Sequence, residues 1–159
     1  PYVGYDNINS FPFLFDGALD DQLKPMDRVI GVVFDDESSV AYTLSRLSAE
    51  EVINDTLGDT ALAVFWKSGT ASALDTGNIA DGNDIGATGV FNANLDGDVL
   101  VFSSNGDGTF SDENTSSTWD IFGNAIDGPL VGMSLKALNH HDTFWFAWAA
   151  FVPGDSLAQ

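Results

Sequence analysis

The chain contains 159 residues, 44% of them hydrophobic, with 24 acidic against 5 basic side chains and a formal net charge of −19. This length and composition predict a folded domain with a substantial core, not a disordered chain. Because cysteine is absent, disulfides, iron–sulfur clusters, cysteine-ligated zinc and cysteine nucleophiles are excluded. The charge disfavours nucleic acid and anionic membrane surfaces as partners, since like charges repel. No apolar run approaches the ~18 residues of a membrane span, so direct membrane insertion is not expected.

The acidic side chains are distributed along the chain and not gathered in one tail. Such a surface tolerates high salt, because ions screen the repulsion among its carboxylates. We therefore expect a halophilic protein, with an ordinary acidic secreted protein as the alternative. The sequence starts at Pro1 and shows no signal peptide. We interpret this start as a processing site in a larger precursor or as a fragment boundary.

We expect residues 1–27 to be irregular, because Pro, Gly, Asn and Asp interrupt their apolar side chains. Beyond them, short apolar runs alternate with Gly, Asn and Asp turns, which is typical of strands joined by hairpins. The expected strands are 28–34, 40–44, 61–66, 88–93, 99–103 and 117–122. Asp96-Gly97 is the strongest hairpin signal, because both residues readily adopt the positive φ of a type I′ turn.

Two short helices are expected. Ser48-Ala49-Glu50-Glu51 has the spacing of a capping box, which predicts a helix over 49–53. Asp142 or Thr143 is expected to cap a second, aromatic helix that runs through Phe151. Together with the strands, these helices predict a single mainly β domain over 1–159, an antiparallel sandwich or partly open barrel, on which 1–27 or a partner packs.

The two histidines of the chain, His140 and His141, are followed directly by Asp142. Imidazole and carboxylate are metal ligands, but adjacent residues of an extended segment point to opposite sides. We therefore favour structural or surface roles, and keep a transition metal or an acid–base role at these residues as the alternative. A metal would need further carboxylates, such as Asp112.

Oxygen-bearing side chains alternate from Asn105 through Asp107 and Thr109 to Ser111. Calcium loops use this spacing, because Ca²⁺ takes six to eight oxygen ligands. However, Ser116 stands where an EF-hand needs a bidentate Glu. We favour a turn between two strands, with calcium as the alternative, and expect no cofactor.

Named catalytic motifs are missing from the sequence. There is no Gly-x-Ser-x-Gly elbow, and Ser72 stands among small residues with no base nearby in the sequence. Paired carboxylates for glycosidic chemistry carry little information in so acidic a chain.

Aromatic side chains are the candidates for contact surfaces. Trp145 and Trp148 share one face of the expected C-terminal helix, and we favour core packing over a sugar or partner platform for them. Phe11, Phe13 and Phe15 lie in the irregular start, where they either contact another chain or fold back onto their own domain.

Asn54 and Asn114 each fit the N-glycosylation pattern. Two matches are close to chance in a chain rich in Asn, Ser and Thr. They matter only if the protein is exported.

The chain resembles a bacterial and archaeal family known as domain of unknown function 3179. The segments that carry the resemblance are Pro1-Tyr-Val-Gly-Tyr-Asp6, Pro12-Phe-Leu-Phe-Asp-Gly17, Val52-Ile-Asn-Asp-Thr56, Val64-Phe-Trp66, Gly69-Thr-Ala-Ser-Ala-Leu-Asp75, Ser117-Thr-Trp119, Gly128-Pro-Leu130 and Phe144-Trp-Phe-Ala-Trp148. Longer members are similar to two tandem halves of an exported, often lipid-anchored precursor, and this chain resembles the second half. The other half typically carries Cys-Pro-x-Cys where this chain reads Phe65-Trp-Lys-Ser-Gly69, so chemistry based on those thiols is not expected here.

From these observations we expect a non-catalytic binding or assembly module at the cell surface or outside the cell. Its expected partner is the sister half of the precursor or another copy of itself. The alternative is a metal-dependent enzyme or metal-binding domain that uses His140, His141 and nearby carboxylates.

Overall fold

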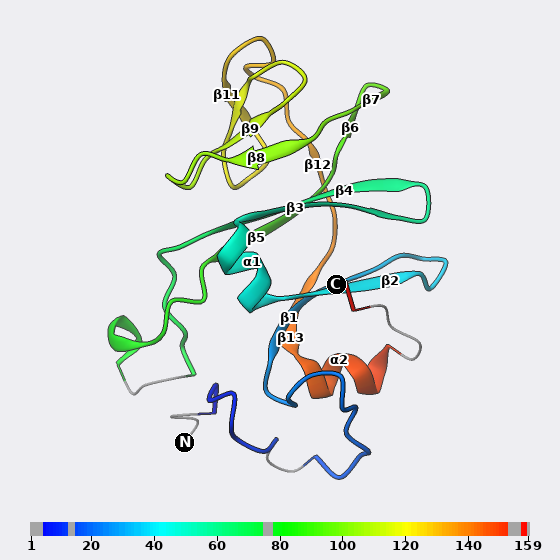
Figure 1. Ribbon diagram of the computed structural model, residues 1–159, viewed down its shortest axis with the longest axis vertical. Helices are drawn as coiled ribbons and strands as arrows, with labels where there is room; N and C mark the ends of the chain where they lie inside the picture. Colours follow the sequence, from blue (N-terminus) through cyan, green and yellow to red (C-terminus); the bar gives the residue numbers. More distant parts are fainter. Residues whose placement is uncertain (1–4, 13–14, 75–77, 153–156, 159) are drawn as a thin grey trace. The chain divides into compact units, whose positions relative to one another are not determined.

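The computed structural model describes residues 5–12, 15–74, 78–152 and 157–158 (Figure 1). In chain order the described elements are β1 (Arg28–Val33), β2 (Ser39–Thr43), α1 (Leu44–Glu50), β3 (Val52–Leu57), β4 (Thr60–Lys67), the 3-10 turn η1 (Ile79–Asp81), β5 (Ala87–Asn92), β6 (Asn94–Leu95), β7 (Asp98–Val99), β8 (Phe102–Ser104), β9 (Phe110–Asp112), β10 (Thr118–Trp119), β11 (Ala125–Asp127), β12 (Lys136–Ala137), β13 (His141–Phe144) and α2 (Trp145–Phe151).

The strands form antiparallel sheets, so the expected mainly β fold class is confirmed. One sheet has the order β13-β1-β2, a second β12-β5-β4-β3 and a third β11-β10-β9-β8, while β6 and β7 form a small hairpin. None of the sheets built from described residues closes into a barrel. No helix in this part of the chain is long and apolar enough to cross a membrane.

The chain divides into two compact units. Unit 1 comprises residues 1–45, 69–85 and 140–159, and unit 2 comprises residues 46–68 and 86–139. The expectation of a single domain stays a prediction.

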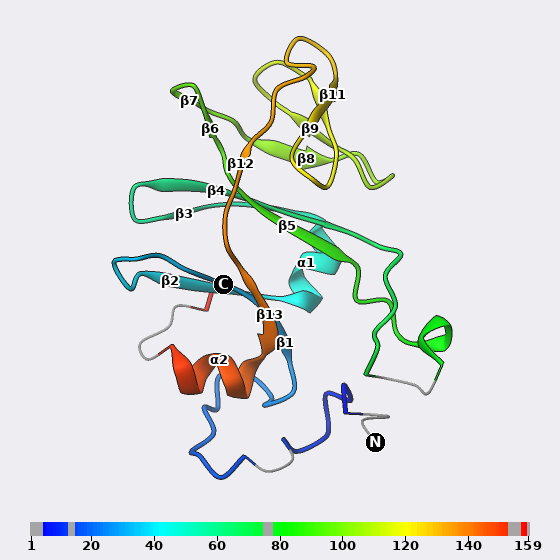
Figure 2. The same cartoon turned by 180° about the vertical axis from the view of Figure 1, so that it is seen from behind.

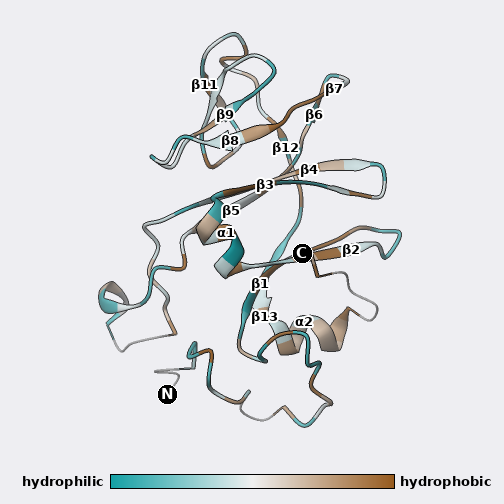
Figure 3. Ribbon diagram, viewed as in Figure 1, coloured by the Kyte–Doolittle hydropathy of each residue, from teal (hydrophilic) through white to brown (hydrophobic). Residues whose placement is uncertain are grey.

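In unit 1, helix α2 packs on the sheet β13-β1-β2. Figure 1 and Figure 2 both show α2 beside β13 and β1, and α2 follows β13 directly in the chain. The core between them consists of Val29, Ala41, Trp145 and Trp148. Figure 3 shows hydrophobic colours along β2 and α2, as expected for elements that bury apolar faces.

In unit 2, two four-stranded sheets enclose an aromatic core, which agrees with the sandwich alternative. Side chains from both sheets meet there: Ala63, Phe65, Phe91, Ala93, Leu100, Phe102, Phe110, Trp119, Ile121, Ala125 and Leu135. Phe65 is central, because its ring stacks on Phe110 at 4.1 Å and meets Phe102 edge-on at 5.1 Å. Offset and edge-on ring pairs of this kind stabilise a core beyond their buried area.

The turn chemistry of the sequence predicted most connections correctly. β1 and β2 pair as the expected hairpin, with Ile30 opposite Tyr42. Asp96 and Gly97 both have positive φ, 53° and 101°, and join β6 to β7. However, the longer strand 88–93 pairs with β4 and not across this turn.

The helix expected over 49–53 is wrong in position. Helix α1 spans Leu44–Glu50, and Val52–Leu57 form β3. Glu51 takes a left-handed conformation, φ 61°, and its backbone N–H donates to the Leu47 carbonyl, which ends the helix. The β-branched Val52 and Ile53 then pair with β4, and this pairing outweighs the capping-box spacing.

The cap expected for the second helix is also wrong, although the helix itself is confirmed. Asp142 and Thr143 lie in β13, and the N-cap of α2 is Phe144, which makes no side-chain cap bond. The Asp142 carboxylate instead accepts hydrogen bonds from Arg28. The described part of 1–27 contains no strand or helix, as expected.

Candidate functional site

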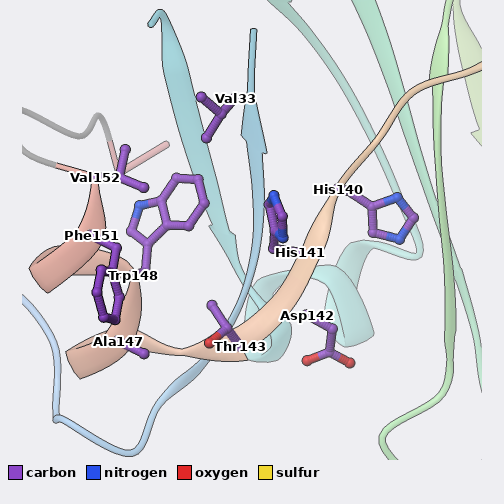
Figure 4. Close-up of a pocket in the computed structure, with 9 residues that line it drawn as sticks. All are labelled: Val33, His140, His141, Asp142, Thr143, Ala147, Trp148, Phe151 and Val152. Carbon is purple, nitrogen blue, oxygen red and sulfur yellow. The ribbon is translucent and has the colours of Figure 1, made fainter.

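The candidate site is a pocket of about 470 Å³ in unit 1, at the junction of β13 and α2 (Figure 4). It is lined by Val33, His140, His141, Asp142, Thr143, Ala147, Trp148, Phe151 and Val152. Pockets of 300–1,000 Å³ with mainly apolar walls and a few polar groups are typical of small-ligand sites.

Strand β13 places its side chains alternately, as an extended segment must. In Figure 4, His140 and Asp142 project on one side of the strand and His141 and Thr143 on the other. The expectation that the two histidines point apart is therefore confirmed. Within the described residues, no group of three or more His, Asp or Glu side chains could hold a metal ion.

The inner wall of the pocket is Trp148, which is 3% exposed. Its six-membered ring lies against the backbone of Gly31, which pairs with His141 and Ala41 in the sheet. Only glycine leaves room for this ring. Trp148 is thus a core residue and a pocket residue at once.

The outer wall includes Phe151, whose side chain is 84% exposed. Val33 at the end of β1 is 36% exposed. An apolar side chain this exposed contributes little to the stability of the fold, but beside a pocket it adds apolar contact area for a ligand.

The indole nitrogen of Trp148 is buried and has no hydrogen-bond partner in the described part of the chain. Figure 4 shows this nitrogen on the side of the ring that faces Val152. A buried donor without an acceptor costs about 1–3 kcal/mol. An acceptor outside the described residues would remove this cost.

The buried indoles of Trp145 and Trp119 both have carboxylate acceptors. The Trp145 Nε1–H donates to Asp20 at 3.3 Å, and the Trp119 Nε1–H donates to Asp112 at 2.9 Å.

The pKa of Asp20 is lowered by hydrogen bonds. The largest effect comes from the Gln22 backbone N–H, and the Gln22 and Trp145 side chains add to it. Trp145 is fully buried, so it presents no contact surface.

Arg28 connects the pocket to a buried polar network. Its guanidinium donates to Asp142 at 2.9 Å, lies 3.7 Å from Asp6, and sits 5.7 Å from the centre of the Phe144 ring. Asp6 has a side chain only 5% exposed and accepts a hydrogen bond from the Ser72 hydroxyl. Ser72, which has no base nearby in the sequence, therefore has a carboxylate partner in the fold.

Asp112, the further carboxylate considered as a metal ligand, is engaged in a buried hydrogen-bond network of unit 2. It is 1% exposed in unit 2, where it accepts hydrogen bonds from the backbone and hydroxyl of Thr115, the backbone of Ser117 and the indole of Trp119. These bonds use the carboxylate to hold a turn between β9 and β10.

The oxygen-rich loop from Asn105 to Ser111 forms a turn between β8 and β9, as the favoured interpretation predicted. Asp107 accepts from the hydroxyl and backbone of Thr109, and Asn105 accepts from the Ser111 hydroxyl. These oxygen atoms satisfy one another within the loop.

The aromatic side chains at the start of the chain differ from one another. Phe15 is half-buried, and its ring contacts Phe146 of α2 at 5.1 Å, so it folds back onto unit 1. Phe11 is 67% exposed, and Phe13 lies outside the described residues.

Both glycosylation candidates are exposed residues whose amides form hydrogen bonds with the backbone of the chain. The Asn54 amide exchanges two hydrogen bonds with the backbone of Phe102, at 2.8 and 2.9 Å, and so connects β3 with β8. The Asn114 amide makes longer contacts, 3.4 Å each, with Val99 and Val101.

A family model described as "Protein of unknown function (DUF3179)" matches residues 1–155. The chain belongs to this family. The resemblance carried by the sequence segments is thereby confirmed over nearly the whole chain. Comparison with curated proteins and comparison with solved structures each give no match.

Two segments that carry the DUF3179 resemblance meet in unit 1. Asp6 belongs to the first segment and Ser72 to the Gly69–Asp75 segment, and the two side chains are hydrogen-bonded. Asp84 holds the start of the latter segment, because it accepts from the backbone N–H groups of Gly69 and Thr70. This DUF3179 motif is thus part of a structural network beside β1.

Sequence reasoning missed the residues that shape the pocket. Gly31 stands in an apolar run with no turn signal, and nothing in the sequence shows that its missing side chain accommodates Trp148. The unpartnered Trp148 nitrogen likewise depends on tertiary contacts. The apolar run 144–151 indicated the helix, but not which of its faces lines a cavity.

Proposed function

We propose that this DUF3179 protein is a non-catalytic binding module that acts outside the cell and that its ligand occupies the pocket between β13 and α2. The observation that carries the proposal is the buried indole N–H of Trp148, a residue that lines that pocket, for which the described part of the chain offers no hydrogen-bond acceptor. The location outside the cell rests on the acidic, cysteine-free composition and on the family resemblance, in which the sister half of a precursor is the expected partner.

The polar groups of the pocket, and the Asp6–Ser72 pair that Arg28 joins to it, support binding more than catalysis. Ser72 is fully buried and hydrogen-bonded to Asp6, so it presents no free nucleophile to a substrate. Asp142 is engaged by Arg28, and His141 projects away from His140. In the proposal, Asp142 and His141 of the pocket lining orient a ligand; together with Ser72 they do not form the nucleophile–base–orienter chain that acyl transfer requires.

The proposal is tested by filling the pocket. Ala147 lines it, whereas Ala150 is exposed on the same helix and does not. Ala147→Phe therefore places a large side chain inside the pocket, and Ala150→Phe places the same side chain on the same helix outside it. Ala150→Phe is the control for any effect of the substitution on the stability of α2.

The measurement is NMR of the backbone amides of β13 and α2 during titration with four probes: cyclohexanol, N-acetyl-leucine amide, phenylacetate and phenethylammonium. We expect at least one probe to shift signals of Thr143, Ala147 and Phe151 saturably in wild type and in Ala150→Phe, but not in Ala147→Phe. Absence of saturable shifts with all four probes in wild type, or equal binding to both variants, would overturn the proposal.

A further inference from the structure

The chemistry of the pocket restricts what it binds. Trp148 lines the pocket, and its buried Nε1–H has no acceptor among the described residues; the lining also includes the apolar side chains of Val33, Phe151 and Val152. A matching ligand therefore carries an acceptor next to a compact apolar group.

The charges around the pocket decide what kind of acceptor fits. Asp142 lines the pocket, and its carboxylate is bonded to Arg28. Arg28 also faces Asp6, so its single positive charge is divided between two carboxylates. An anionic ligand would find no uncompensated cation at this network and would approach a protein of net charge −19.

A cationic ligand is not favoured either. Asp142 already has Arg28 as its partner at 2.9 Å, and the indole N–H needs an acceptor, which an ammonium group does not supply. What remains is a neutral oxygen acceptor, and among hydroxyl, ether and carbonyl oxygens the amide carbonyl is the strongest acceptor.

We infer that the pocket binds a neutral, peptide-like amide whose carbonyl oxygen accepts the Trp148 indole hydrogen bond while a branched apolar side chain lies against Val33 and Phe151. This inference rests on the proposed binding function and specifies its ligand. Because the nitrogen is covered in the structure, the acceptor reaches it only when a covering group moves aside; Val152 lies on the nitrogen side of the ring (Figure 4). Phe151, which is mostly exposed, has few contacts to lose.

The test compares three probes that share one apolar group. N-acetyl-leucine amide is neutral, N-acetyl-leucine carries a carboxylate, and leucine amide carries an ammonium group. The readout is the indole N–H signal of Trp148 in protein labelled with ¹⁵N-tryptophan. The indole signals of Trp119 and Trp145, which are bonded to Asp112 and Asp20, are internal controls in the same spectrum.

We expect the neutral probe to bind at least about fivefold more tightly than either charged probe. The Trp148 signal should move downfield as its N–H gains an acceptor, and those of Trp119 and Trp145 should stay in place. Trp148→Phe keeps an aromatic ring but removes the N–H, and it should lower the affinity for the neutral probe by about fivefold. Asp142→Asn should strengthen binding of N-acetyl-leucine several-fold, because it removes a negative charge from the pocket.

The outcomes separate this inference from the proposed function. Tighter binding of either charged probe, or binding of the neutral probe without a shift of the Trp148 indole signal, overturns the ligand assignment and leaves the pocket as a binding site. If none of the three binds and the four probes of the preceding experiment also fail, the binding function itself is overturned. If Trp148→Phe does not fold, the shift of the Trp148 indole signal in the wild-type protein alone decides whether the ligand accepts this hydrogen bond.

Discussion

Trp148 occupies the space that a side chain at position 31 would need. A Cβ atom placed on Gly31 would lie 2.0 Å from Trp148 Cζ3 and 2.4 Å from two further ring atoms. The contact fixes α2 on the sheet of unit 1 and, with it, the inner wall of the pocket.

Gly31→Ala should therefore lower the free energy of unfolding by about 1–3 kcal/mol, the usual cost of overpacking a core. Urea denaturation measures the change. The same substitution in a Trp148→Leu background is the control, because removing the large ring should remove most of the cost. An equal cost in both backgrounds would mean that Trp148 is not the obstacle.

The sequence predicts the local elements of this fold better than its site. Positive-φ turns such as Asp96-Gly97 and the β-rich run of β1 are encoded by neighbouring residues, so they are recognisable in one dimension. Helix α1 was misplaced because pairing of Val52 and Ile53 with β4, a contact between strands, ends the helix before 51. The Ser72–Asp6 bond and the Gly31–Trp148 contact join residues 66 and 117 positions apart, and no local pattern reveals such pairs.

The side-chain amide of Asn54 bridges β3 and β8 of unit 2 with one donated and one accepted hydrogen bond, as a backbone peptide group would. Its removal should therefore destabilise that unit. Asn54→Ala leaves the backbone N–H and carbonyl of Phe102 without their partners, so we expect a loss of about 1–3 kcal/mol in thermal or urea unfolding.

Asn114→Ala is the matched control for Asn54→Ala. It makes the same chemical change, but the Asn114 contacts are 3.4 Å long, so the cost should be below that of Asn54→Ala. Equal costs for the two variants would contradict the bridging role of Asn54.

Hydrogen bonds from the Thr109 hydroxyl, which has the largest effect, and from the Thr109 backbone N–H lower the pKa of Asp107 below its ordinary value. A carboxylate whose pKa is lowered on folding stabilises the fold above its unfolded pKa, and this contribution is lost as the pH falls through the folded pKa.

Thr109→Val should therefore raise the pKa of Asp107 towards the ordinary value, as measured by ¹³C NMR titration of the carboxyl groups. Asp36 is the internal control, because its pKa is lowered by the hydroxyl and backbone of Ser38 and should not respond to the substitution. A pKa of Asp107 that stays the same in the variant would show that the Thr109 hydroxyl is not the main cause.

Removal of divalent ions should leave the fold intact. The described residues bring no three His, Asp or Glu side chains together, and the Asn105–Ser111 loop satisfies its oxygen atoms internally. We expect the same melting temperature, within about 1 °C, before and after treatment with EDTA in constant molar chloride, since a ΔΔG of 1 kcal/mol would shift it by several degrees. A stoichiometric metal in the purified protein, or a large decrease on chelation, would favour the metal-binding alternative.

Salt should stabilise this protein strongly. With 24 acidic against 5 basic side chains, carboxylate repulsion acts over roughly 30 Å at 0.01 M salt but only about 3 Å at 1 M. The melting temperature should therefore climb between dilute buffer and molar chloride, most steeply below about 0.5 M, where the screening length changes most.

Two further measurements separate screening from a general salting-out effect. Sucrose at matched osmolality should not reproduce the steep initial rise, because it does not screen charge. The exposed residues Glu113 and Asp127 offer the matched variant: Glu113→Lys with Asp127→Lys removes two negative charges and adds two positive ones, and should flatten the salt response. A wild type whose melting temperature is the same in dilute buffer and in molar chloride would contradict the halophilic expectation, because its carboxylates would then not repel one another enough to affect folding.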